Sequence, residues 1–222
     1  MEMRAGFHKR LREIQDEVLE MGSMVTKAIL LSNDALKDRD LATAKQIIAD
    51  DIKVNRKRFE IEEKCIQLIA TQQPMASDLR IIICMLSIVT EIERIGDYAE
   101  GIAKIVVMIG DEPPLKPLID IPRMVEIAVG MLHRSLDALI KRDADVARQV
   151  VAEDDEVDNL YNQVFRELLT FMIQDPKTIT RATRLLWVAH NLERSADRVT
   201  NICERVVFCV TGKMQEIGAS KY

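Results

Sequence analysis

The chain is poor in the residues that turn-rich and β-rich folds require. Its 222 residues include only 8 glycines, 6 prolines and 1 tryptophan, and aromatic residues make up 4%. A doubly wound nucleotide-binding fold needs glycine-rich turns, and a β-sandwich needs strand aromatics and frequent turn residues. With 48% hydrophobic and 30% charged residues, the composition instead indicates a globular, almost wholly helical protein.

Long apolar runs and charge blocks of one sign are also missing. The most apolar stretch, residues 81–89, is interrupted by Ser87 and is far shorter than the ~20 residues of a membrane span. The formal net charge is -5, and no basic stripe carries interleaved aromatics, so we expect no nucleic-acid partner. The first residues lack the apolar core of a secretory signal. We therefore expect a cytoplasmic protein.

Cysteine and histidine are scarce and do not form a recognisable catalytic pattern. The four cysteines make no C-x-x-C pair and lie within apolar helical patterns, so we expect reduced thiols in the core. None of the three histidines follows a glutamate by three residues, as a di-iron carboxylate helix requires. P-loop, nucleophile-elbow and zinc-protease motifs are absent as well. Together these absences favour a binding or regulatory protein over an enzyme.

Apolar residues at helical spacing, in contrast, run through almost the whole chain. Three such stretches precede residue 110, and three more follow residue 120. One of them keeps a strict step of seven, namely Ile47, Val54, Ile61 and Leu68. Turns are expected at 38–40, Pro74, 141–143 and Pro176. The sequence therefore predicts six helices.

The two halves of the chain repeat each other. The segment A-K-Q-I-I-A at 44–49 matches A-R-Q-V-V-A at 147–152, and the E-R pair at 93–94 matches the pair at 193–194. We predict an all-α fold of two tandem three-helix bundles related by internal pseudo-symmetry. The expected boundaries are 1–110 for the first bundle, 111–120 for a proline-rich linker, 121–212 for the second bundle and 213–222 for a flexible tail.

Each half also carries two polar pairs with members four residues apart, which lie on one helical face at about 6 Å. The first half has Asp51 with Asn55 and Glu93 with Asp97; the second half has Asp154 with Asp158 and Glu193 with Asp197. Carboxylates on two neighbouring helices form a cluster that repels itself and attracts a cation. Oxygen-rich ligands favour Mg²⁺, Ca²⁺, Mn²⁺ or iron over a closed structural zinc site.

Other interpretations of these acids remain open. They can form a solvated helix face, because a chain with 36 acidic residues contains several acidic pairs at this spacing by chance. Arg94 and Arg194 can neutralise the carboxylates as salt bridges without a metal. His190, three residues before Glu193, can join the second cluster or lie on a polar face.

Several segments resemble the PhoU family of regulators that accompany the phosphate-specific transport system. They are T-Q-Q-P-M-A-S-D-L-R at 71–80, E-R-I-G-D at 93–97, E-P-P-L-K-P at 112–117, and L-E-R-S-A-D at 192–197 with Asn201. The similarity runs in order over about residues 5–212. It implies metal clusters held by Glu/Asp-x-x-x-Asp pairs, with the eight pair residues above as ligands and iron, manganese, magnesium, calcium or zinc as the ion.

The resemblance also implies a function. Members of the family restrain phosphate uptake and phosphate-starvation signalling, contact the importer's ATPase subunit and a membrane sensor histidine kinase, and commonly form homodimers. This chain would then meet a membrane only through its partners. The alternatives are a metal-dependent phosphohydrolase, a metal-storage protein or a metal-free scaffold.

Two departures from the pattern predict weaker metal binding in the first bundle. Asn55 stands where the second half has Asp158, and Gly101 stands where it has Asn201, which removes one charge and one amide.

Overall fold

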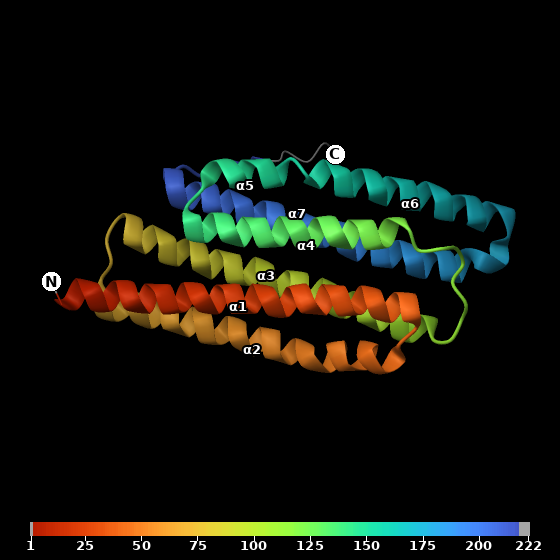
Figure 1. Cartoon of the computed structure of the whole chain (residues 1–222), viewed down its shortest axis with the longest axis horizontal. Helices are drawn as coiled ribbons and strands as arrows, with labels where there is room; N and C mark the ends of the chain where they lie inside the picture. Colours follow the sequence, from red (N-terminus) through yellow and green to blue (C-terminus); the bar gives the residue numbers. More distant parts are fainter. Residues whose placement is uncertain (1, 218–222) are drawn as a thin grey trace.

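The computed structural model describes residues 2–217, and every regular element among them is a helix. The first bundle consists of α1 (Glu2–Asp38), α2 (Leu41–Gln72) and α3 (Ser77–Ile109). The second consists of α4 (Asp120–Lys141), α5 (Ala144–Val151), α6 (Asp154–Gln174) and α7 (Ile179–Thr211), with a 3₁₀ turn at Pro176–Thr178. Figure 1 shows the bundles side by side along the long axis of the molecule. The predicted all-α architecture of two three-helix bundles is confirmed.

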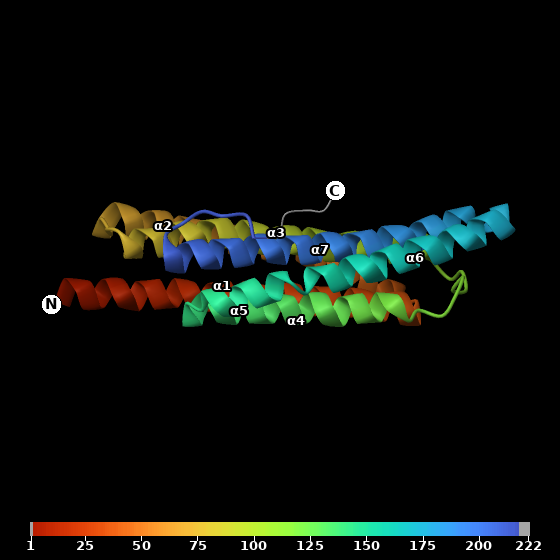
Figure 2. The same ribbon diagram turned by 90° about the horizontal axis from the view of Figure 1, so that it is seen from above.

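The two bundles pack through equivalent helices. α3 lies against α7 in the most extensive contact between any two elements, and α1 lies against α4. In both pairs the helices run in opposite directions, as the colours of Figures 1 and 2 show. Equivalent helices that pack antiparallel are related by an approximate two-fold axis, so the sequence repeat appears in space as internal symmetry. The buried apolar residues form one cluster that extends through both bundles.

The predicted turns coincide with helix ends. Asp40 caps α2 by accepting hydrogen bonds from the backbone of Ala42 and Thr43, both at 3.0 Å. Asp143 caps α5 in the same way, accepting from Asp145 and Val146 at 3.0 Å. The step-of-seven residues of α2 are all buried. α7 ends where Gly212 adopts a left-handed conformation, with φ of 74°.

The structure differs from the prediction of six continuous helices in one place. The second helix of the second half breaks at Ala152–Glu153, so that α5 and α6 replace one helix, whereas α2 is continuous. Glu153 forms an ion pair with Arg134 of α4. The break makes Asp154 the first residue of α6, where a carboxylate lies at the positive end of the helix dipole.

The proline-rich connection between Gly110 and Ile119 is anchored to the second bundle. Lys116 is buried, and its ammonium forms ion pairs with Asp120, at 3.4 Å, and with Glu167 of α6. Gln163 donates a further hydrogen bond to Asp120 at 3.2 Å. A buried ammonium needs such partners, so this contact fixes where α4 begins relative to α6.

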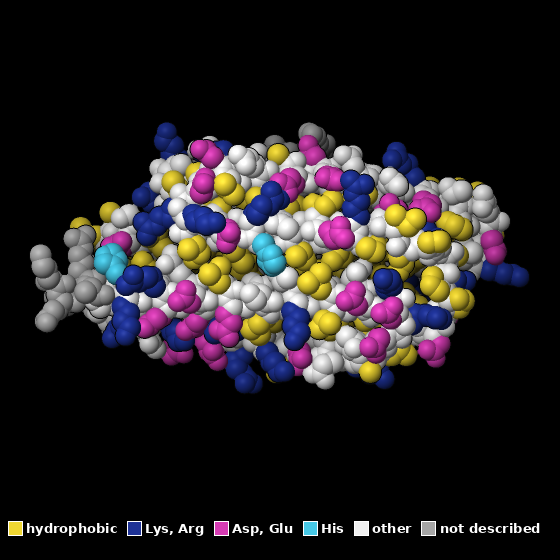
Figure 3. Space-filling view, in the orientation of Figure 1, with side chains coloured by type: hydrophobic (Ala, Val, Ile, Leu, Met, Phe, Trp, Pro, Cys, Tyr) yellow, Lys and Arg dark blue, Asp and Glu magenta, His cyan; other side chains and the backbone are white. Residues whose placement is uncertain are grey.

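Residues 213–217 turn back along α7, where the backbone of Ile217 donates to Glu204 at 3.0 Å; the rest of the predicted flexible tail, 218–222, lies outside the described residues. Among residues 2–217, the helices include none that combines the length and apolar character needed to span a membrane. Hydrophobic side chains gather along the line where α1 and α4 meet, with charged residues on both flanks (Figure 3).

Candidate metal centres

The first cluster lies between α2 and α3. Asp51 faces Asp97 and Glu100 closely enough for their charges to raise its pKa, although burial is the larger cause. Burial, followed by repulsion from Asp97, likewise raises the pKa of Glu93. The structure thus brings the predicted carboxylates of the first half together, and their mutual repulsion disfavours full ionisation.

An amide and a guanidinium stabilise two carboxylates of this first cluster. Asn55 donates a hydrogen bond to Asp51 at 2.7 Å. Arg58, one turn further along α2, forms an ion pair with Glu93 at 3.1 Å, with both side chains largely buried. Arg58 is not among the predicted site residues, although it lies seven residues after Asp51 and therefore on the same helical stripe. The equivalent position in the second half is Tyr161, which has no positive charge.

The second cluster is more strongly acidic. Burial, and then repulsion from Asp158, Asp197 and Glu193, raises the pKa of Asp154 to about 7. The pKa of Glu193 is also raised to about 7, by burial first and then by Asp197. One carboxylate oxygen of Asp154 and one of Glu193 are buried without a hydrogen-bond partner. Unpartnered buried anionic oxygens are costly, and a bound cation would satisfy them.

Cations of the chain contact this second cluster as well. Arg194 forms an ion pair with Asp197 at 2.6 Å, and its pKa is raised, against the effect of burial, by the nearby Tyr98 of α3 and by the carboxylates. The predicted salt-bridge alternative therefore holds for this one carboxylate. His190 Nδ1 lies 3.5 Å from Glu193 Oε2, so the histidine stands beside the cluster, although half of its side chain is exposed. All four predicted residues of this cluster are carboxylates, whereas the four of the first cluster are three carboxylates and the Asn55 amide.

The side chains are not arranged around a common ion. Within residues 2–217, no three His, Cys, Asp or Glu side chains stand in a position to hold a metal together. The donor set nevertheless fits a hard cation, because it consists of carboxylate oxygens with unpartnered members in the second cluster. The metal ligands therefore remain a prediction.

Asn201 contacts the first bundle, although the sequence predicted its amide beside the second cluster. Its side chain donates to Glu91 of α3 at 3.1 Å, across the contact between the bundles. At the symmetric position, a Cβ added to Gly101 would lie 3.1 Å from the Asn191 side chain, so glycine leaves room for that residue. The exchange of Asn201 for Gly101 thus concerns the α3–α7 contact, and the clusters themselves differ at Asn55 against Asp158 and at Arg58 against Tyr161.

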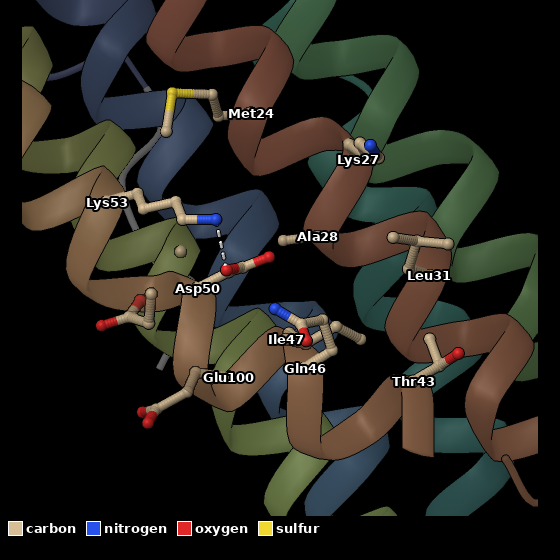
Figure 4. A pocket seen from close by; sticks show the side chains of 12 residues that line it. Met24, Lys27, Ala28, Leu31, Thr43, Gln46, Ile47, Asp50, Lys53 and Glu100 are labelled. Atoms are coloured by element: carbon tan, nitrogen blue, oxygen red, sulfur yellow. Dashed lines mark ion pairs between the residues drawn. The ribbon is translucent and has the colours of Figure 1, made fainter. Parts of the chain in front are cut away.

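A groove of about 400 Å³ opens beside the first cluster. Its lining is mostly apolar and comes from α1 and α2, as Figure 4 shows for Met24, Leu31 and Ile47. The ion pair between Lys53 and Asp50, at 2.6 Å, belongs to the same groove. Asp51 and Glu100 also line it, so that the first cluster is accessible from this side.

These features define an all-helical, two-bundle scaffold with one carboxylate cluster in each half. The family model described as the PhoU domain matches the chain twice, at residues 18–106 and 121–206, once in each bundle. The chain belongs to the PhoU family. The predicted family resemblance is therefore confirmed.

Similar proteins support the same assignment. A "phosphate-specific transport system accessory protein PhoU homolog" of Clostridium acetobutylicum is 40% identical over 95% of this chain and 97% of that protein. A protein of the same description from Aquifex aeolicus is 39% identical over 84% of each chain. The crystal structure of PhoU from Pseudomonas aeruginosa matches with a TM-score of 0.88 at 34% identity, covering 93% of this chain and 100% of that one. Because the family and its solved members are accessory or regulatory proteins, the expectation that this chain is not an enzyme is confirmed.

Proposed function

We propose that the chain is an accessory regulator of phosphate uptake and of phosphate-starvation signalling. Its relatives are named as accessory proteins of the phosphate-specific transport system. The similarity covers 84% of one relative and 97% of another. In this role it is a metal-binding adaptor that contacts the ATPase subunit of the phosphate importer and a sensor histidine kinase. It acts in the cytoplasm as a homodimer and reaches the membrane only through these partners.

The second carboxylate cluster carries the metal-binding part of the proposal. The second cluster consists of four carboxylates with one neighbouring arginine, and two of its buried oxygens have no hydrogen-bond partner. The carboxylates are those of Asp154, Asp158, Glu193 and Asp197. A bound divalent or trivalent cation would neutralise these carboxylates and convert a repulsive surface into a docking surface for another protein. The first cluster, which contains Asn55 and Arg58, binds the same cation more weakly.

The proposal is tested by pull-down of the importer ATPase with metal-loaded and chelator-treated chain. Exchange of Glu193 and Asp197 for Gln and Asn keeps the side-chain shapes and removes two charges. We expect this variant to lose the bound metal, measured by elemental analysis, and to capture less ATPase. The matched control is Glu13→Gln, which removes an exposed acid from α1.

The two parts of the proposal fail separately. Undiminished ATPase capture by a metal-free variant would remove the metal from the mechanism and leave the adaptor role intact. Absence of any capture by the unaltered, metal-loaded chain would refute the adaptor role itself. Turnover of a phosphate ester that depends on Glu193 would favour the phosphohydrolase alternative instead.

A further inference from the structure

Two of the four cysteines face each other across the contact between the bundles. Cys84 lies near the beginning of α3 and Cys209 near the end of α7, and both are buried free thiols. Their side chains are close enough for each thiol to shift the pKa of the other. In the linear sequence they are far apart, and only the packing of α3 against α7 brings them together.

The register of the two helices accounts for this proximity. Glu91 of α3 lies beside Asn201 of α7, at 3.1 Å, and Tyr98 contacts Arg194. Because the helices are antiparallel, one step back along α3 corresponds to one step forward along α7. Cys84 lies two turns before Glu91, and Cys209 lies about two turns after Asn201, so both cysteines reach the same level.

The surroundings of the pair favour reaction at Cys209. The hydrogen bond from Cys84, together with the positive charges of Arg142 and Arg80, lowers the pKa of Cys209, and the same hydrogen bond with burial raises that of Cys84. Cys209 lies in the last turn of α7 and retains 7% exposure, whereas Cys84 is fully buried. Cys209 is thus the more accessible of the two buried thiols, and a thiol with a lowered pKa beside positive charges and a second thiol is open to oxidation.

We propose that Cys84 and Cys209 form an oxidation site, at which a peroxide converts the two thiols into a disulfide that joins α3 to α7. The Cys209 thiolate attacks one peroxide oxygen, and the O–O bond breaks to give a sulfenic acid and, after protonation, water. The Cys84 thiol then attacks the sulfenic sulfur, its proton leaves with the hydroxyl group as a second water, and the S–S bond forms. The two thiols lose two electrons, which reduce the peroxide.

This bond would connect the two bundles covalently at one end of their largest contact. It closes a loop over residues 84–209. The loop contains most of α3, the linker, α4 to α6 and nearly all of α7. A cross-link of this kind restricts the unfolded chain and holds the ends of α3 and α7 together. The relative position of the two carboxylate clusters would then be fixed by the oxidation state.

The test is treatment of the folded, full-length chain with hydrogen peroxide, followed by peptide mapping without reduction. We expect a peptide pair that joins Cys84 to Cys209, lighter than its reduced form by two hydrogen atoms. We also expect a higher urea midpoint of unfolding, which returns to the untreated value after dithiothreitol. The control variant Cys65→Ala/Cys203→Ala should still give the cross-linked peptide and the higher urea midpoint. Cys209→Ala should give neither.

Other results overturn the proposal. They include a disulfide that involves another cysteine or a second chain, peroxidation of Cys209 to the sulfinic acid with Cys84 still free, and four unmodified thiols. A mapped Cys84–Cys209 bond that lowers the urea midpoint would also contradict it, because the bond would then form only by distorting the helix contact.

Discussion

The single amide in the first cluster offers a test of whether these carboxylates bind a cation or only form salt bridges. In the structure, Asn55 donates to Asp51 at 2.7 Å. Asn55→Asp removes this hydrogen bond, which is worth about 1.5–3 kcal/mol when the acceptor is charged. It also places a second carboxylate there, and two charges about 4 Å apart repel by about 1 kcal/mol in water and ~4 kcal/mol near a protein surface. Because both residues are only half-buried, solvent screens the repulsion toward its lower value, and we expect the metal-free chain to lose about 2.5–4 kcal/mol of stability.

The same substitution should have the opposite effect on metal binding. An added carboxylate gives the first cluster the donor set of the second, so we expect its Mn²⁺ affinity to rise about tenfold or more, which corresponds to ~1.4 kcal/mol. Urea denaturation in chelator measures the stability. Calorimetric titration with Mn²⁺, in a Glu193→Gln/Asp197→Asn background that silences the second cluster, measures the affinity.

Two controls separate charge from shape. Asn55→Ala loses the hydrogen bond without adding a charge, so it should destabilise the chain and leave Mn²⁺ affinity no higher. Asp158→Asn makes the reciprocal change and should weaken Mn²⁺ binding in the second bundle. If Asn55→Asp destabilises the chain but leaves Mn²⁺ binding unchanged, the clusters are salt-bridged surfaces and the metal hypothesis is wrong.

Three further substitutions test other parts of the structure. Arg58→Gln removes the positive charge that pairs with Glu93 at 3.1 Å and would repel a bound cation. Calorimetry should then show Mn²⁺ affinity at the first cluster rising about tenfold, and no rise would show that Arg58 does not compete. Lys116→Met leaves Asp120 buried without its cation and should lower the free energy of unfolding in urea by about 3 kcal/mol, and a neutral result would mean that the linker is not anchored there. Gly110→Ala should cost more than Gly212→Ala. Gly212 has the left-handed conformation, which costs alanine about 1–2 kcal/mol, and the Arg80 guanidinium near its new Cβ can move aside, whereas Gly110, with φ of 64° and ψ of -137°, lies in a region almost restricted to glycine. A larger loss for Gly212→Ala in urea would show that Arg80 cannot move.

The local rules of helix formation made most of the fold predictable. Apolar spacing identified the buried stripe of each helix, and short-range capping and proline chemistry identified the ends at Asp40 and Asp143. The repeat predicted two equivalent bundles, because a duplicated sequence has duplicated apolar faces to bury. The break between α5 and α6 was not predictable in this way, since it accompanies an ion pair between Glu153 and Arg134 of another helix.

The sequence by itself determined which helix faces carry the acids, because residues four apart must lie on one face whatever the fold. Only the tertiary structure decided what meets those acids from other helices: Arg58 of α2 pairs with Glu93 of α3, and one oxygen of Asp154 is buried without a hydrogen-bond partner. The same holds for Asn201, which contacts Glu91 of the other bundle, and for the pairing of Cys84 with Cys209. Such contacts depend on how α3 and α7 align, and no spacing within either helix specifies that alignment.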